Sequence, residues 1–185
     1  IKNAEQLLKN AGSDLDRKAR ELALKALNEA LKAVDPEVII KSQVQVEGNR
    51  LRMANLSFNS DDFKSIYIVG GGKASGCMAA ALEEILGDRL KEGVVNVPYA
   101  CPSYPTRRVK LQRASHPTPD SAGVEGTRHM LDLVSHAKEN DLIISLISGG
   151  GSSLMPEPAR GVSLRDKRRL TDALLKSGAT IKEIN

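Results

Sequence analysis

The sequence predicts an α/β domain with a parallel sheet and helices on both faces. Two observations predict it: from Lys64 onward short apolar runs alternate with helical patterns, and two of these runs end in glycine-rich turns. The runs at 66–69 and 142–147 are rich in β-branched residues without polar alternation, which is typical of parallel strands buried on both sides. Alternation of strands and helices also favours a parallel sheet with right-handed crossovers.

Composition and charge are those of an ordinary globular domain. The chain has 185 residues, of which 41% are hydrophobic, and a net charge of +4. Its basic residues are dispersed apart from groups at 107–110 and 165–169, and no apolar run reaches membrane-spanning length, so we expect neither a nucleic-acid nor a membrane partner. Its two cysteines, Cys77 and Cys101, lack metal-like spacing, which predicts a reduced, cytoplasmic protein.

Residues 1–63 are predicted to form a helical segment and a hairpin that pack on the core. Apolar residues recur at three- and four-residue steps over 13–34, and Ser13 begins a capping box. Pro36 is acceptable at the first position of a second, shorter helix. The polar stretch 47–50 lies between apolar residues and predicts a β-hairpin.

Residues 64–185 are predicted to form the sheet domain, in which strands lead into helices. The first strand is followed by a helix at 75–86 that Gly87 closes. Thr118 is expected to cap a later helix, with Pro119 at its first helical position. The expected strands lie at 66–69, 93–97, 109–114 and 142–147, and the expected helices at 75–86, 119–138 and 164–178.

The last residues predict the start of one more helix. Thr180 and Glu183 stand three residues apart, in the pattern of a capping box. Because this signal comes just before the last residue, Asn185, we interpret the chain as a fragment whose sheet domain is truncated at its C-terminal end. The alternative is a frayed tail after Gly178.

The two glycine-rich turns predict a ligand that is rich in phosphate. A strand, a tight glycine turn and a helix N-terminus together present bare N–H groups and a positive dipole end. The turns do not match the two familiar phosphate-binding motifs, however. Lys73 does not have the spacing from a preceding glycine that a P-loop requires. In the dinucleotide-binding fingerprint, Ser75 replaces the third glycine and the acidic residue after the second strand is missing. The candidate phosphate-binding residues are Gly70, Gly71, Gly72, Ser148, Gly149, Gly150, Gly151, Ser152 and Ser153.

Lys73 is the sharpest single candidate for catalysis. A cation beside a helix N-terminus opposes the helix dipole, and an intervening anion would offset that cost; the alternative is a solvated surface lysine. The serines of the second turn could likewise bind phosphate or cap a helix. His116 could face a ligand or hydrogen-bond its own loop. No general base or metal ligand stands out, since helix capping explains Asp120.

Four motifs in this order resemble those of one known family. They lie at 69–74, 115–120, 147–154 and 177–185, within a resemblance that spans about residues 35–185. On these motifs the chain resembles the glycerate 2-kinases, of the type whose C-terminal half is a MOFRL domain.

This resemblance implies phosphoryl transfer from ATP, with Mg²⁺, to the 2-hydroxyl of D-glycerate, giving 2-phosphoglycerate and ADP. It implies a Rossmann-like first domain and a cleft shared with a second, MOFRL-like domain that is absent from this chain, so the fragment is expected to be catalytically incomplete. Lys73 matches the family's catalytic lysine, and 148–153 matches its phosphate-binding loop. His116 is a candidate substrate-binding residue, and the metal ligands stay unassigned. A homodimer is possible, but the sequence does not determine the oligomeric state.

Two other functions compete with this interpretation. An NAD(P)-dependent hydroxypyruvate reductase is a name that similar sequences carry, but the missing acidic residue after the second strand argues against it. A non-enzymatic module that binds sugar phosphates would use the same Ser/Gly loops. Such a module would bind a phosphorylated metabolite without turnover.

Overall fold

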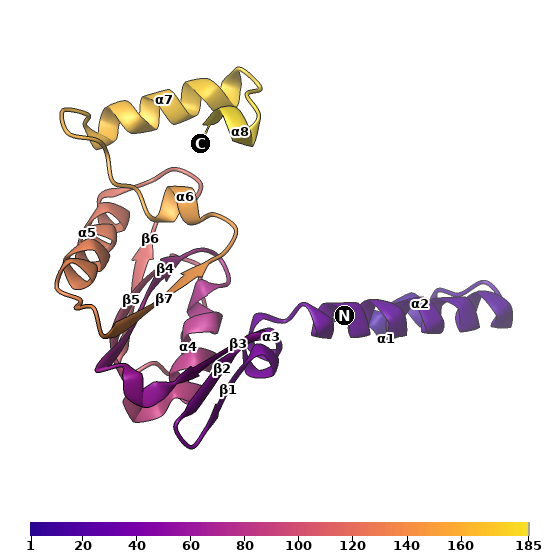
Figure 1. Cartoon of the computed structure of the whole chain (residues 1–185). Helices are drawn as coiled ribbons and strands as arrows, with labels where there is room; N and C mark the ends of the chain where they lie inside the picture. Colours follow the sequence, from indigo (N-terminus) through magenta and orange to yellow (C-terminus); the bar gives the residue numbers. More distant parts are fainter. Residues whose placement is uncertain (185) are drawn as a thin grey trace.

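A four-stranded parallel sheet forms the centre of the molecule (Figure 1). The computed structural model describes residues 1–184. The strand order is β6-β5-β4-β7 and every neighbouring pair is parallel, so the predicted α/β class is confirmed. The strands are β4 (Ser65–Gly71), β5 (Leu90–Pro98), β6 (Val109–Ala114) and β7 (Asp141–Ile147).

Helices cover both faces of this sheet, α4 (Ser75–Leu86) on one and α5 (Ser121–Ser135) on the other (Figure 1). Neighbouring residues of a strand point to opposite faces. Val95 of β5 accordingly lies in one apolar cluster with Leu82 of α4, whereas Asn96 donates a hydrogen bond to Gly123 of α5. Leu82 is 1% exposed, and burying such a side chain stabilises the fold by about 1.5–3 kcal/mol.

The direction in which the chain crosses the sheet changes between β4 and β7. From β4 the chain passes through α4 to β5 and then to β6 at one edge, and α5 carries it back to β7 on the other side of β4. The loops that leave β4 and β7 therefore start side by side. Such a topological switch point, at the carboxyl ends of the strands, is where open α/β sheets bind their ligands.

The segment before the sheet packs on the outer side of α4. Val44 and Leu51 belong to the same apolar cluster as α4, and the segment lies against that helix. Its antiparallel sheet contains the predicted hairpin plus a third strand that the sequence analysis missed, because the turn before it uses Ala54 at φ 53° rather than a glycine. The elements are α3 (Pro36–Gln43), β1 (Val44–Glu47), β2 (Arg50–Met53), β3 (Leu56–Asn59) and the 3₁₀ helix η1 (Ser60–Asp62).

Helices α1 (Ala4–Lys9) and α2 (Asp14–Ala33) project from this body as an arm (Figure 1). Ser13 caps α2 as predicted, because its hydroxyl accepts a hydrogen bond of 3.1 Å from the amide of Asp16. Leu24 is the one buried residue of α2, whereas Leu15 is 80% exposed. The apolar face of α2 is therefore largely uncovered in this chain.

The start of α5 differs from the prediction. Asp120 rather than Thr118 is the N-cap: its backbone is extended and its carboxylate accepts a 2.9 Å hydrogen bond from the amide of Gly123. Pro119 therefore precedes the cap instead of occupying the first helical position. An aspartate at the cap satisfies an orphan amide and also favours the positive end of the helix, so it prevails over the earlier threonine.

Other boundaries are close to those predicted. Helix α5 ends at Ser135 and not near Lys138, because the amide of Lys138 donates to the carboxylate of Asp141 and turns the chain into β7. Strand β5 is longer than the predicted 93–97. Gly87 closes α4 as predicted, with φ 53°, and begins the 3₁₀ helix η2 (Gly87–Arg89).

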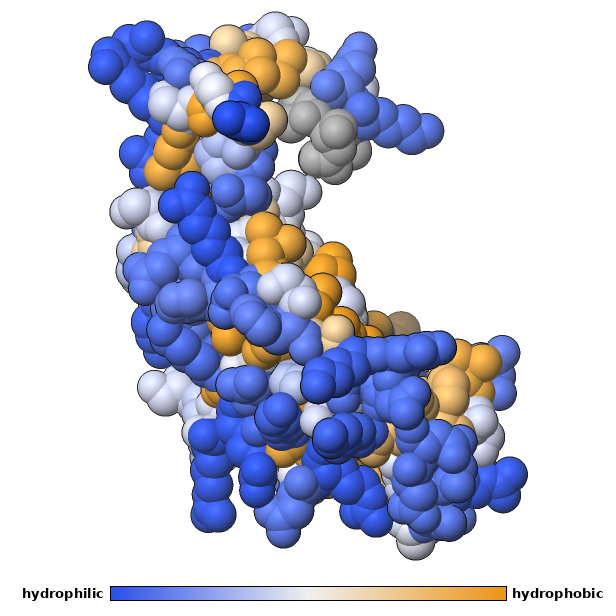
Figure 2. Space-filling view, turned by 60° about the vertical axis from the view of Figure 1, so that its left-hand side comes forward, coloured by the Kyte–Doolittle hydropathy of each residue, from blue (hydrophilic) through white to orange (hydrophobic). Residues whose placement is uncertain are grey.

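The short helix α6 (Gly151–Leu154) contacts β4 and β5 of the sheet. The last two helices, α7 (Leu164–Lys176) and α8 (Ile181–Ile184), stand apart from it (Figure 1). The capping box of Ser163 with Asp166 is present in both directions, and Glu183 accepts a 2.7 Å hydrogen bond from the amide of Thr180. Figure 2 shows the molecule hollowed between α7, at the top, and the body. Apolar side chains are exposed on both parts, Leu170 at 62% and Ile147 at 57%.

Candidate functional site

The two glycine-rich turns meet at the switch point of the sheet. Strands β4 and β7 are in register up to the pair Gly71 and Ile147, so the turns that follow them begin at the same height. The amide of Lys73 donates to the carbonyl of Gly149 at 2.9 Å, and the amide of Ser148 donates to the carbonyl of Gly71 at 3.3 Å. The tertiary structure thus joins the two predicted phosphate loops into one site.

The glycines of the first turn make room for the second turn. Gly70 and Gly72 have φ values of 150° and 149°, which side chains rarely adopt. A methyl group built on Gly70 would lie 2.1 Å from the carbonyl oxygen of Leu146, and one on Gly72 would lie 2.1 Å from Oγ of Ser148. Gly71 is also buried, against Met155. These glycines are therefore required by packing.

The amides of the first turn are bonded within the protein. The amides of Gly72 and Lys73 donate to the carbonyls of Asn96 at 3.1 Å and Gly149 at 2.9 Å. The amide of Ala74 donates to the hydroxyl of Ser148 at 3.0 Å, and that of Ser75 to the carbonyl of Gly72 at 3.4 Å. The Ser75 hydroxyl is fully buried and donates to the carbonyl of Leu146 at 3.1 Å. This turn therefore offers a ligand no amide from 72–75, and what it presents to solvent is the side chain of Lys73.

The amides of the second turn are free. Within residues 1–184, those of Gly149, Gly150, Ser152 and Ser153 have no hydrogen-bond acceptor. Gly149 and Ser152 are exposed, and Gly150 has φ 90°, in the left-handed region that glycine tolerates. Successive free amides in such a turn form a concave anion-binding surface. The phosphate-binding amides predicted for both turns are thus available only in the second.

The serines of the second turn have different surroundings. Ser148 accepts a 3.0 Å hydrogen bond from the amide of Ala74 and bonds the hydroxyl of Ser75 at 3.1 Å, so it ties the two turns together. Ser153 donates to the carbonyl of Gly150 at 3.1 Å. Ser152 is exposed, and its hydroxyl has no protein partner within residues 1–184. It is the serine best placed to reach a ligand.

Lys73 and His116 converge on Gly150. A methyl group built on Gly150 would lie 2.7 Å from both Nε2 and Cδ2 of His116 and 3.6 Å from Cε of Lys73. Lys73 is exposed, and its ammonium group has no carboxylate or hydrogen-bond partner in the described part of the chain. Neither ring nitrogen of His116 has one there either. A cation and an imidazole therefore border the free amides.

Two buried residues that support this site escaped the sequence analysis. Asn96, at the end of β5, is fully buried and donates to the carbonyls of Leu154 at 2.7 Å and Gly123 at 2.9 Å, so it ties α6 to α5. Ser75 links the first turn to β7. Ser75 occupies the position of the third glycine in the dinucleotide fingerprint, and Asn96 lies where that fingerprint has an acidic residue. These departures from the motif were the available signal. Their structural role depends on hydrogen bonds to residues far away in the sequence.

Asp120 has a structural role. Its carboxylate caps α5 and accepts a 2.8 Å hydrogen bond from the hydroxyl of Tyr99. Burial opposes its ionisation, but the hydrogen bonds from Gly123 and Tyr99 outweigh burial and hold its pKa below the usual value. The carboxylate therefore stays charged at neutral pH.

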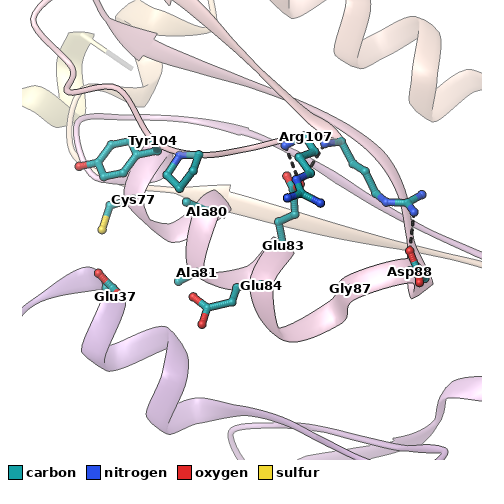
Figure 3. Close-up of a pocket in the computed structure, with 12 residues that line it drawn as sticks. Glu37, Cys77, Ala80, Ala81, Glu83, Glu84, Gly87, Asp88, Tyr104 and Arg107 are labelled. Carbon is teal, nitrogen blue, oxygen red and sulfur yellow. Dashed lines mark hydrogen bonds and ion pairs between the residues drawn. The ribbon is translucent and has the colours of Figure 1, made fainter.

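A pronounced hollow lies away from the glycine turns, between α3, α4 and the loop after β5 (Figure 3). It has a volume of about 530 Å³. Its carboxylates are already paired: Glu83 accepts from the amides of Arg107 and Arg108 at 2.7 and 3.0 Å, and Asp88 pairs with Arg108 at 2.7 Å. Glu37 and Glu84 each pair with Lys41 at 2.9 Å. Burial raises the pKa of the Cys77 thiol at its edge, which argues against a reactive thiolate. We interpret this hollow as a packing groove.

In residues 1–184 no three His, Cys, Asp or Glu side chains are grouped so that they could hold a metal ion. No helix in this part of the chain is long and apolar enough to cross a membrane. His129 and His136 are exposed on or next to α5.

Fold and site together define a Rossmann-like α/β domain with an amide-lined site at its switch point. The chain belongs to the family described as "Domain of unknown function (DUF4147)", which it matches over residues 22–185. It is similar to the glycerate 2-kinase of Pyrococcus horikoshii, with 38% identity over 166 residues that cover 90% of this chain and 37% of the relative. The resemblance that the four motifs indicated is thereby confirmed.

A solved structure and a differently named relative complete the comparison. The crystal structure of a glycerate kinase from Thermotoga maritima matches with a TM-score of 0.72 and 36% identity, over 89% of this chain and 36% of that one. A putative hydroxypyruvate reductase of Agrobacterium vitis is 46% identical over 118 residues, which cover 64% of this chain and 30% of the relative. The chain thus spans 30–37% of the lengths of these relatives.

Proposed function

We propose that the full-length protein is a glycerate 2-kinase, which transfers the γ-phosphoryl group of ATP to the 2-hydroxyl of D-glycerate. The observation that carries this proposal is the unpaired ammonium of Lys73 beside the free amides of Gly149, Gly150, Ser152 and Ser153. Phosphoryl transfer depends on positioning the reacting groups and on neutralising the negative charge of the phosphates. Backbone amides and a cation can do both.

In this proposal each part of the site has one task. The amides of 149–153 hold the phosphate oxygens of the nucleotide, and the Ser152 hydroxyl adds a donor. Lys73 balances negative charge on the transferred group or on the glycerate carboxylate. His116, from the loop after β6, lies on the substrate side. The first turn, 70–72, supports the second by close packing, and its own part in holding phosphate stays a prediction.

The proposal assigns no magnesium ligand to this chain. The resemblance implies Mg²⁺, but the described residues do not provide a carboxylate cluster for it. Magnesium commonly keeps most of its contacts to water and to substrate phosphates. Four further points likewise stay proposals, drawn from the resemblance and the composition. They are the MOFRL-like second domain, the division of the chain into a segment 1–63 and a sheet domain 64–185, a homodimer, and a cytoplasmic location.

The test is ADP release by the full-length protein with ATP, Mg²⁺ and D-glycerate, against a control without glycerate. Lys73→Ala is expected to lower kcat by roughly 10²- to 10³-fold, as removal of one preorganised charge-stabilising group does. Lys110→Ala, which removes an exposed lysine of β6, is the matched control and is expected to keep full activity. Undiminished kcat in a folded Lys73→Ala variant would exclude a catalytic role for this lysine.

A second candidate is the hydroxypyruvate reductase, favoured by the name of the Agrobacterium relative. The position where a dinucleotide site needs an acid for the ribose is in the region of Asn96, which is fully buried and occupied with backbone carbonyls. Assays of both reactions on the same protein preparation distinguish the two functions. Oxidation of NADH with hydroxypyruvate, without glycerate-dependent ADP release, would replace the kinase proposal with the reductase.

A further inference from the structure

We propose that His116 is the general base of the reaction and accepts the proton of the substrate hydroxyl. This inference rests on the proposed kinase function and names a role that the motifs alone left open. Its geometric basis is the approach of the imidazole to Gly150, where a built methyl group would touch Nε2 at 2.7 Å. The ring therefore lies against Gly150, whose amide is free and which the Lys73 side chain also approaches, and its nitrogens have no partner in the described residues.

The other polar groups around this loop are less suited to accept a proton. Asp120 is occupied on both oxygens, by the amide of Gly123 at 2.9 Å and the hydroxyl of Tyr99 at 2.8 Å, and these bonds favour its charged form. Lys73 already has another task in the proposed function, which is to neutralise phosphate charge. The Ser148 hydroxyl is bonded to Ala74 and Ser75. Within residues 1–184, His116 is the remaining basic group at the meeting point of the two turns.

The proposed step balances without a further reactant. The 2-hydroxyl oxygen of glycerate forms a bond to the γ-phosphorus while its proton passes to a ring nitrogen of His116. The bond from the γ-phosphorus to the β–γ bridging oxygen breaks, and ADP leaves with that electron pair. The imidazolium that forms next to the product then returns its proton to solvent.

The experiment compares His116→Ala with wild type in the full-length protein, using glycerate-dependent ADP release and calorimetric binding of a non-hydrolysable ATP analogue. We expect kcat to fall by roughly 10²- to 10⁴-fold, the range for loss of a general base, while nucleotide affinity changes less than about threefold. Imidazole added to the buffer is expected to restore part of kcat, because it can enter the space left by the ring. His129→Ala, on the exposed face of α5, is the matched control and is expected to behave as wild type.

Each result decides a different question. No glycerate-dependent ADP release by wild type overturns the proposed function itself, and this inference with it. An active wild type with undiminished kcat in His116→Ala overturns only the inference about His116. Joint loss of kcat and nucleotide affinity without rescue by imidazole also overturns it and indicates a ligand-holding role. If the alanine variant fails to fold, His116→Gln serves instead: it keeps the side-chain bulk without a basic nitrogen, and retained kcat overturns the proposal.

Discussion

The two glycine-rich turns have similar compositions, but the backbone amides of the first are bonded within the protein and several of those in the second are free. In the first turn the glycines are buried against the neighbouring strand and turn, and the amides of 72–75 all bond within the protein. In the second turn Gly149 faces open space, and four amides have no partner within residues 1–184. The first turn is therefore a packing device that aims Lys73, whereas the second offers a surface for an anion.

This difference shows that a glycine cluster has two separate physical causes. Glycine is required where a Cβ would strike another part of the backbone, and also where a ligand must approach bare amides. Substitutions that affect stability in one turn and binding in the other separate the two causes. The following predictions use that contrast, from the largest expected effect to the smallest.

Gly70→Ala is expected to destabilise the protein severely, by at least about 3 kcal/mol, because its Cβ would collide with backbone at a φ that alanine rarely adopts. Gly149→Ala is the matched control, and we expect it to change stability by less than about 0.5 kcal/mol because nothing lies within 4 Å. Urea unfolding measures both. Equal stability losses in the two variants would contradict the contrast between the turns.

Gly150→Val is expected to weaken ATP binding at least about tenfold, corresponding to 1.4 kcal/mol, because the side chain would displace His116 and cover the free amides. Gly161→Val is the control, since Gly161 has nearly the same φ, 87° against 90°, but open surroundings in the loop before α7. Calorimetric titration gives both affinities. Loss of affinity in both variants would point to backbone strain instead of contact with the nucleotide.

Ser75→Ala is expected to cost about 1–3 kcal/mol of stability, because it leaves the carbonyl of Leu146 without its buried donor. Ser152→Ala removes an exposed hydroxyl and is expected to leave stability unchanged while weakening ATP binding. Thermal unfolding and nucleotide titration of both variants provide the comparison. A stable Ser75→Ala protein with weakened ATP binding would reverse the roles assigned to the two serines.

Asp120→Asn is expected to have the smallest effect, a loss of up to about 1 kcal/mol at pH 7, because asparagine also caps helices but lacks the charge that favours a helix N-terminus. The pKa of Asp120 is lowered from 3.8 in the folded protein. Its charge therefore stabilises the fold above the unfolded value of 3.8, and this stabilisation is lost as the pH falls through the lower folded value.

Urea unfolding at a series of pH values measures this prediction. The difference between wild type and Asp120→Asn is expected to shrink as the solution is acidified below 3.8. Glu139→Gln, at an exposed position without a hydrogen-bond partner in the described residues, is the control and is expected to show no such trend. A difference that grows on acidification would mean that the cap stabilises the fold in its protonated form.

Local signals predicted most elements of the fold. The strands at 66–69 and 142–147 and the cap at Ser13 were found because β-branched runs and capping residues act over a few positions. The cap of α5 was predicted at Thr118 but lies two residues later, at Asp120. Both residue types cap helices, and the choice depends on which side chain reaches the amide of Gly123. The third strand of the N-terminal sheet was missed for lack of a glycine in its turn.

The candidate site was predicted in its parts but not in its arrangement. Lys73, His116 and Gly150 were each singled out, although no signal along the chain related them to one another. Ser75 was noticed only as a departure from a known motif, and Asn96 was not singled out. Their roles depend on hydrogen bonds such as that from Ala74 to Ser148, which spans 74 residues of sequence.

The sequence by itself determined the α/β class, the order of strands and helices, and the resemblance to glycerate 2-kinases. These features are encoded in short patterns, whose periodicity and capping chemistry act through neighbouring residues. Only the tertiary structure decided which glycine turn keeps its amides free and that Lys73 and His116 meet at Gly150. That outcome follows from the placement of β7 beside β4, which depends on the burial of the whole sheet and not on any one segment.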